Sequence, residues 1–304
     1  MEMNKRTIIF AAALVSAAIF TACNSKTSLQ LEKEYILFSD TLSVNPVMSG
    51  EGYSFNVPVT STVTKNYDRT IAVEVIDEGS TAIEGVNYRL GSNTVVIPAG
   101  KLSANVEVFP AYDTFNDVDT LSFNLKLVVP QDQKWDMYGD MHKVSMVKRC
   151  PFSIETFSGY SIVTSLFLYQ YPGPNTSFER LVKTYVVEGE DNTILMKDWL
   201  FDGYDIKIKL EPSDPMNPVV TMTPGQVVSD EASVFGQILG DNRIKIEASA
   251  FYPSYFNSCQ KFVALWIRAY VDNMSVPVGT VGHFYNIIQW ISDEEAEKLQ
   301  REGL

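Results

Sequence analysis

Histidine and cysteine are scarce in this sequence, which holds two histidines and three cysteines in 304 residues. The histidines, His142 and His283, stand far apart, and no cysteines have the close spacing of a zinc site. A glycine-rich phosphate loop, a Gly-x-Ser-x-Gly nucleophile turn and a His-Glu-x-x-His helix are also missing. These absences predict neither a catalytic residue nor a cofactor.

Basic residues are also in short supply. The chain has 24 lysines and arginines against 37 acidic residues, a formal net charge of −13. A surface this acidic repels phosphate backbones, so a nucleic-acid partner is not expected. The sequence also lacks the apolar run of about 20 residues that a permanent transmembrane helix requires.

The N-terminal residues have the pattern of an export signal. Lys5 and Arg6 precede an apolar run that ends in small residues before Cys23. A charged start, a short apolar run and a small residue before the cut predict a secretory signal over residues 1–22. A cysteine directly after the small residues resembles the lipobox of bacterial lipoproteins, in which that cysteine is acylated. The resemblance implies that Cys23 attaches the chain to the bacterial outer membrane through residues 23–34, a polar tether. Which face of the membrane it occupies stays open.

Two cysteines, Cys150 and Cys259, remain after Cys23. Exported proteins commonly contain disulfides, and a bond here would close a loop of about 100 residues, worth about 4 to 5 kcal/mol in the chain-entropy model. The alternative is a pair of buried thiols. Sequence spacing does not decide between the two, because it does not place the Cβ atoms.

Residues 35–130 alternate between apolar and polar side chains in short runs. Leu121, Phe123 and Leu125 share one face of such a run, and Ser122 and Asn124 share the other. Turn-forming clusters separate the runs, and no helical periodicity lies between them. Short alternating strands at this spacing predict an antiparallel β-sandwich.

Part of this region resembles the Calx-β type of Ig-like sandwich. The similarity is carried by four segments: Glu84–Tyr88, Val95–Gly100, Val106–Asp113 and Leu121–Leu125. In that family, acidic residues around these segments imply calcium binding, and the candidates here are Asp113, Asp117 and Asp119. Asn87 and Leu121 stand where the family has carboxylates, although calcium requires several oxygen ligands. A solvated acidic loop is the alternative.

Residues 131–156 form a predicted linker, and residues 157–291 contain about eight further strand-like segments. Ile206, Ile208 and Leu210 alternate with lysines, and Asp-Gly turns join neighbouring segments. Sequential hairpin-linked strands predict an up-and-down β-barrel. We expect strands over both Ser161–Tyr169 and Ala232–Leu239.

Segments of this region resemble lipocalin-like domains of uncharacterised Bacteroidetes envelope lipoproteins. They are Gly159-Tyr160, the turn and strand Gly189–Leu200, and Val219–Gln226. The Gly-x-Trp of true lipocalins is absent, so the resemblance does not imply a small hydrophobic ligand inside the barrel. Residues 292–304 predict a short terminal helix, because Ser292 and Glu295 form a capping box. The predicted fold class is therefore all-β, with an Ig-like sandwich followed by a lipocalin-like barrel.

Aromatic residues on proline-containing stretches are the candidate ligand-binding residues: Tyr169, Tyr171, Tyr252, Tyr255 and Phe256. Exposed rings on loops stack on sugars or anchor protein partners. Alternatively, the same rings cap the ends of the barrel.

Together these patterns favour a lipid-anchored, non-enzymatic envelope protein that binds a glycan or a protein partner. Similar-looking lipoproteins accompany polysaccharide-uptake systems, which favours a glycan by analogy. The alternatives are a structural or assembly subunit of a surface complex, and a glycoside hydrolase. A hydrolase would need two carboxylates facing each other across a cleft, an arrangement without a sequence signature.

Overall fold

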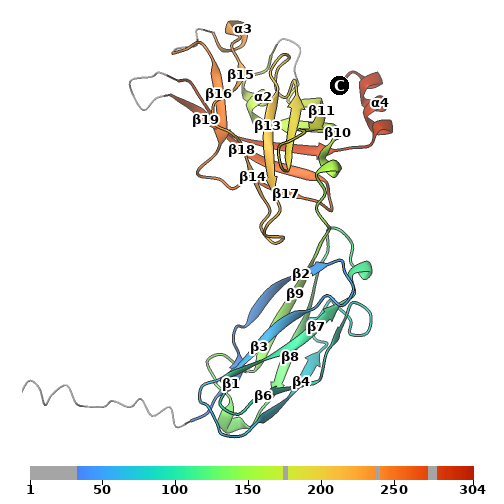
Figure 1. The fold of residues 1–304 in the computed structure, drawn as a ribbon, viewed down its shortest axis with the longest axis vertical. Helices are drawn as coiled ribbons and strands as arrows, with labels where there is room; N and C mark the ends of the chain where they lie inside the picture. The colour runs from blue at the N-terminus through green and yellow to red at the C-terminus, as the bar shows by residue number, and fades with distance from the viewer. Residues whose placement is uncertain (1–32, 174–176, 237, 239, 273–278) are drawn as a thin grey trace, which may run out of the picture.

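The computed structural model describes residues 33–304, except 174–176, 237, 239 and 273–278. The predicted signal sequence, Cys23 and all but the end of the predicted tether lie outside the described residues. The chain is an all-β protein with few helices, and Figure 1 shows two β-rich parts arranged end to end. None of the helices in the described ranges is long and apolar enough to cross a membrane.

The N-terminal part consists of two sheets. The four-stranded sheet has the order β1 (Ile36–Phe38), β3 (Phe55–Ser61), β7 (Ser103–Pro110), β5 (Tyr88–Leu90). The five-stranded sheet has the order β2 (Leu42–Met48), β9 (Met141–Arg149), β8 (Thr120–Val128), β4 (Arg69–Ile76), β6 (Thr94–Ile97). Every pairing within these sheets is antiparallel except that of β2 with β9, which is parallel.

The side chains between these sheets follow the alternation of the sequence. Phe123, Leu125 and Leu127 of β8 are fully buried, and the Phe123 ring stacks on Tyr88 with centroids 3.7 Å apart. Burying each such side chain contributes about 1.5 to 3 kcal/mol. The period-two pattern therefore identified which face of β8 enters the core.

The C-terminal part is built around a closed barrel of eight strands. In order around the ring they are β10 (Gly159–Ser165), β11 (Glu179–Val186), β12 (Thr193–Lys197), β13 (Ile206–Glu211), β14 (Val219–Thr221), β17 (Tyr255–Asn257), β18 (Phe262–Tyr270) and β19 (Thr280–Trp290). Pairing of β19 with both β10 and β18 closes the ring.

Two further strands, β15 (Gln226–Ser229) and β16 (Ile244–Ala248), extend the barrel wall. The first residues of β18 pair with β17, and residues Ile267–Tyr270 pair with β16. The side chain of Gln226 then joins β15 to β13. Its Oε1 accepts from the Lys207 N–H at 2.7 Å, and its Nε2 donates to the Lys207 carbonyl at 2.8 Å. A side-chain amide thus takes the place of a neighbouring strand's peptide group.

Two predicted strands are interrupted by helices. The strand predicted over Ser161–Tyr169 ends at Ser165, where α2 (Leu166–Gln170) begins. The Ser165 hydroxyl accepts from the Leu168 N–H at 3.3 Å, so this serine acts as an N-cap. The segment Ala232–Leu239 was also predicted as a strand, and it contains α3 (Ala232–Phe235) instead.

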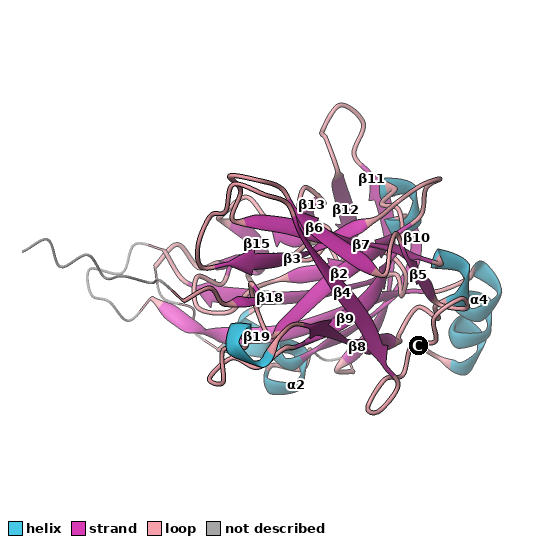
Figure 2. Ribbon diagram, turned by 90° about the horizontal axis from the view of Figure 1, so that it is seen from below, coloured by secondary structure: helices cyan, strands magenta, loops and turns pink. Residues whose placement is uncertain are grey.

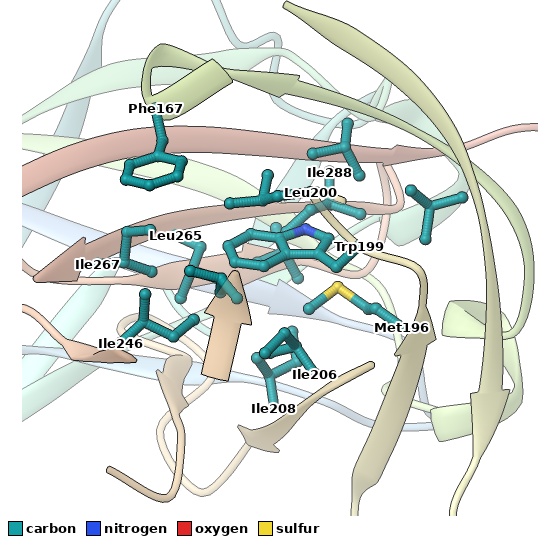
Figure 3. Packing of buried hydrophobic residues seen from close by; sticks show 14 of the residues in the cluster. Phe167, Met196, Trp199, Leu200, Ile206, Ile208, Ile246, Leu265, Ile267 and Ile288 are labelled. Carbon is teal, nitrogen blue, oxygen red and sulfur yellow. The ribbon is translucent and has the colours of Figure 1, made fainter. Parts of the chain in front are cut away.

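Large side chains fill the barrel interior. Figure 3 shows Trp199 at the centre of this core, surrounded by Met196, Leu200, Ile206 and Leu265. Paired strands form the wall of the barrel. Figure 2 shows from below that the molecule consists mostly of strands, with the helices α2 and α4 at its edge. The barrel core is thus packed with the protein's own side chains.

The chain ends in the helix α4 (Asp293–Glu302), as the capping box predicts. Ser292 Oγ accepts from the Glu295 N–H at 3.2 Å. Gly303 follows with φ of 96°, the left-handed conformation that favours glycine at a helix C-terminus.

Candidate functional site

Aromatic side chains gather on the outer surface of the barrel over β18 and β19. Because strand residues alternate, Phe284, Asn286 and Ile288 point into the barrel, whereas Tyr285 and Ile287 point outward. Tyr285 lies opposite Trp266 of β18, and the two ring centroids are 5.1 Å apart. The sheet register therefore creates this outward-facing ring pair.

The loop between β16 and β17 adds two more rings to this surface. Tyr252 stacks on Trp266 with centroids 4.3 Å apart, and Phe251 lies 5.2 Å from His283. Ser249 orders the loop: its Oγ accepts from the backbone N–H groups of Phe251 and Tyr252 and lies 2.9 Å from His283 Nδ1. These rings remain accessible, since Phe251 is 77% and Tyr252 46% exposed.

On the other side of Tyr285, an apolar groove of about 340 Å³ runs between α2 and β19. It is lined by Tyr285 and Ile287 together with Leu166, Tyr169 and Phe178. Since Tyr285 belongs to both the groove and the ring pair with Trp266, the two areas are continuous. We call this continuous surface the aromatic face. It comprises Leu166, Tyr169, Phe178, Phe251, Tyr252, Tyr255, Trp266, Tyr285 and Ile287.

Polar groups lie beside these rings. Burial and the neighbouring Tyr255, through its charge and a hydrogen bond, raise the pKa of Tyr285. The hydroxyl of Tyr285 therefore stays protonated near neutral pH and can donate a hydrogen bond. Arg268 donates to Glu247 at 2.7 Å and to Thr280 at 2.8 Å. The aromatic face thus offers flat apolar surfaces bordered by hydrogen-bonding groups.

Three of the five predicted binding rings lie on the aromatic face, and two do not. Tyr169, Tyr252 and Tyr255 are 74%, 46% and 44% exposed. The prediction was wrong for Phe256, which is 3% exposed because it alternates with Tyr255 on β17 and points into the core. Tyr171 does not lie on the aromatic face either, because its half-buried ring packs against the core residues Phe167 and Phe284.

Sequence reasoning missed several rings of the aromatic face, Trp266 and Tyr285 among them. These rings occupy the outward-facing positions of β18 and β19, and the alternation of inward and outward residues along each strand could have identified them. It was obscured because inward and outward positions are both apolar. The sequence prediction therefore placed strands here without assigning these rings to the inner or the outer face.

The three candidate calcium ligands do not converge. Asp117 forms an ion pair with Lys148 at 3.0 Å, and Asp119 accepts from Asn116 Nδ2 at 2.7 Å. Asp113 lies in a short 3-10 helix, Tyr112–Thr114. Within the described residues, the grouping with metal-like spacing is Asp117 with Cys150 and Cys259, and those cysteines are bonded to each other.

Cys150 and Cys259 form a disulfide, which was one of the two alternatives that the sequence left open. The bond joins the residue after β9 to the turn between β17 and β18, with Cα atoms 5.0 Å apart. It closes a loop of 109 residues. The end of the N-terminal part is thereby attached to the barrel directly before β18, the strand that carries Trp266.

The two histidines are held by hydrogen bonds within the protein. His142 is 2% exposed, with Nδ1 2.7 Å from the Asp40 carbonyl and Nε2 2.8 Å from Ser43 Oγ. Burial lowers the pKa of His142. His283 lies under Phe251 and bonds Ser249. His283 therefore supports the loop that carries Phe251 and Tyr252.

Solved structures that are similar to this chain include two Bacteroides ovatus proteins and a Calx domain. A B. ovatus protein of unknown function is 13% identical over 86% of this chain and 92% of its own, with a TM-score of 0.36. A putative carbohydrate binding protein from B. ovatus is 10% identical over 82% and 74%, with a TM-score of 0.31. The apo-form Calx CBD1 domain is 16% identical over 38% and 97%, also with a TM-score of 0.31.

No curated protein matches the chain in sequence. A family model does match, over residues 137–302, which include β9, the disulfide and the whole barrel with its aromatic face. That match spans more than half of the chain, and the protein therefore belongs to the family described as a domain of unknown function, DUF4984.

Proposed function

We propose that this protein is a non-enzymatic binding protein of the bacterial envelope whose aromatic face binds a glycan. The observation that carries the proposal is the row formed by Tyr252, Trp266 and Tyr285, three neighbouring rings on the outside of the barrel. Sugar rings have apolar C–H faces that stack on aromatic rings, and sugar hydroxyls bond to polar groups at the ring edges. Both kinds of group are present here.

The rings are held in place before any ligand arrives. Trp266 and Tyr285 lie on paired strands, and Ser249 orders the loop that carries Tyr252. A preorganised surface loses little conformational entropy on binding, so more of the contact energy contributes to affinity. This rigidity favours a binding surface over an accidental cluster of exposed rings.

The proposal includes the envelope location and the two-domain organisation. Cys23 would carry the lipid that attaches the chain to the outer membrane, and the following residues would serve as a tether. An Ig-like sandwich would then hold a lipocalin-like barrel away from the membrane. Strong attachment requires two acyl signals or more, which lipoprotein processing of such a cysteine supplies.

A panel of plant, microbial and host polysaccharides tests the proposal. In affinity electrophoresis, the purified protein should be retarded by at least one polysaccharide of the panel. The N-terminal part has a row of rings of its own, Tyr35, Trp135 and Tyr138, with centroids 5.6 and 5.0 Å apart. Retardation should therefore be lost in a Trp266→Ala variant and kept in a Trp135→Ala variant. If no polysaccharide of a broad panel retards the protein, the glycan proposal is wrong.

A second candidate function is the docking of a protein partner. The groove between α2 and β19 favours it, because Leu166 and Ile287 add aliphatic surface that sugars do not require. Apolar grooves with aromatic rims are common anchor sites at protein interfaces. Crosslinking in cells followed by pull-down would identify such a partner, and Leu166→Asp should abolish its capture.

A further inference from the structure

Arg149, the last residue of β9, is a positive charge without a close counter-ion. The side chain is partly buried, and its Nε atom is buried with no hydrogen-bond partner in the described part of the chain. Among the described residues, no ion pair within 4.0 Å includes Arg149. A guanidinium remains protonated in proteins, so the charge persists despite this burial.

Asp214 is the acidic residue that acts on Arg149 electrostatically. Burial lowers the pKa of Arg149, and the charge of Asp214 opposes this effect. The carboxylate of Asp214, however, is used locally: it accepts from the Met216 N–H and from Asn217 Nδ2, both at 2.9 Å. The guanidinium therefore retains donors that a further anion could use. A partly desolvated cation gains more from such a partner than an exposed one does.

Arg149 lines a pocket of about 330 Å³ at the junction of the two parts. Pro218, Pro253 and Tyr255 provide apolar walls, and Asn217 and Asn257 provide amide groups. The volume lies at the lower end of the range for small-ligand pockets, about 300 to 1,000 Å³. The disulfide begins at the next residue, Cys150, so the backbone beside the arginine is covalently held.

The pocket adjoins the aromatic face through Tyr255. This ring lines the pocket, lies 6.0 Å from the Phe262 ring and is hydrogen-bonded to Tyr285. Ser254, beside it in the pocket wall, accepts from the Trp266 N–H at 2.9 Å. A chain stacked on Trp266 and Tyr285 can therefore continue past Tyr255 toward Arg149.

We propose that Arg149 binds the carboxylate of a hexuronate residue within a glycan whose neighbouring sugars stack on the aromatic face. The planar guanidinium presents parallel donors that match the two oxygens of a carboxylate. A formal net charge of −13 on the protein disfavours a polyuronate, which would bring many negative charges close to the surface. An otherwise neutral chain with an isolated uronate satisfies both conditions. This inference rests on the proposed glycan binding and specifies the class of glycan.

The test compares oligosaccharides that each carry one hexuronate with the same molecules after carboxyl reduction to the neutral sugar. Wild-type protein should bind the acidic form about tenfold to a hundredfold more tightly, as expected for charge-assisted hydrogen bonds. Arg149→Gln should bind both forms equally, with the affinity that the wild type has for the neutral form. Arg149→Lys keeps the charge but not the paired donors, and should retain part of the preference.

Thermal unfolding and thiol titration would verify that each variant is folded with its disulfide intact. The inference is wrong if acidic and reduced forms bind the wild type equally, or if Arg149→Gln keeps the preference. In either case neutral binding to the aromatic face would still support the proposed function. If neither form of any oligosaccharide binds, the proposed function fails and the inference fails with it.

Discussion

At the scale of single residues, buried polar groups of the N-terminal part are matched to partners in one protonation state. The Asp40 carbonyl requires an N–H on Nδ1 of His142, which leaves Nε2 as an acceptor for the Ser43 hydroxyl. Asn45 Nδ2 donates to the same hydroxyl at 2.8 Å, so Ser43 is already supplied with a donor. With a proton on Nε2, both His142 and Asn45 would donate to the Ser43 oxygen, and the Ser43 hydroxyl hydrogen would lose its acceptor.

This arrangement makes stability depend on pH. Burial lowers the pKa of His142 below its ordinary value of 6.5, so the unfolded chain binds the proton more tightly than the native protein does. Stability should then fall as the pH is lowered through 6.5 toward the native pKa. Denaturant unfolding between pH 7.5 and 5 measures the effect. His142→Gln should lose this part of the dependence and His283→Gln should keep it; equal dependence in all three proteins would contradict the assignment.

At the scale of secondary-structure elements, one side chain joins the added strand β15 to β13 of the barrel. Gln226 pairs with both backbone groups of Lys207 and so holds β15 against β13. No periodicity predicts such a contact, because the side chain replaces a strand that is absent at that position. The contact is visible only once the register of β13 and β15 is known.

Gln226→Ala should cost about 1 to 3 kcal/mol, since it leaves the N–H and carbonyl of Lys207 without these partners. Gln226→Glu is the matched control. Its carboxylate still accepts from the Lys207 N–H, but its second oxygen would face and repel the Lys207 carbonyl, so this variant should be destabilised as well. Amide exchange at Lys207 should speed up in the alanine variant and remain slow in the glutamate variant. Slow exchange in both variants would show that the Gln226 side chain does not protect the Lys207 N–H and does not hold β15 against β13.

The elements also show how far the sequence could predict the fold. Ile206, Ile208 and Leu210 are buried as their alternation predicts, because lysines on the other face fix the orientation of β13. For β18 and β19 the same rule was ambiguous, since apolar side chains occupy both faces. The parallel pairing of β2 with β9 was also beyond local patterns, because it joins segments about 100 residues apart, such as Val44 and Ser145. Partner choice at that separation depends on the whole fold.

At the scale of the whole molecule, two separate hydrophobic cores are joined by one covalent bond besides the chain itself. One core surrounds Phe123 in the N-terminal part, and the other surrounds Trp199 in the barrel. The disulfide from Cys150 to Cys259 joins the two parts at the residue that follows Arg149. The disulfide therefore fixes the position of the end of β9 relative to β18.

Replacing both cysteines by serine should reduce the free energy of unfolding of the barrel by about 4 to 5 kcal/mol, the chain-entropy value for a loop of this length. Urea unfolding followed by tryptophan fluorescence measures the change. Reducing agent should destabilise the wild type by a similar amount and leave the double-serine variant unaffected. Unchanged stability in the double variant would mean that the bond contributes nothing beyond the native packing.

The central claim is that the aromatic face binds a glycan, and one affinity comparison tests it most directly. Tyr252→Ala removes an exposed ring of the face, whereas Tyr67→Ala removes a ring of the N-terminal part that is at least as accessible, 56% exposed against 46%. With a glycan that retards the wild type, calorimetry should give roughly tenfold weaker binding for Tyr252→Ala, as for a typical interface anchor. Tyr67→Ala should bind as tightly as the wild type. Equal affinity for the wild type and Tyr252→Ala, or a loss in Tyr67→Ala alone, would contradict the account.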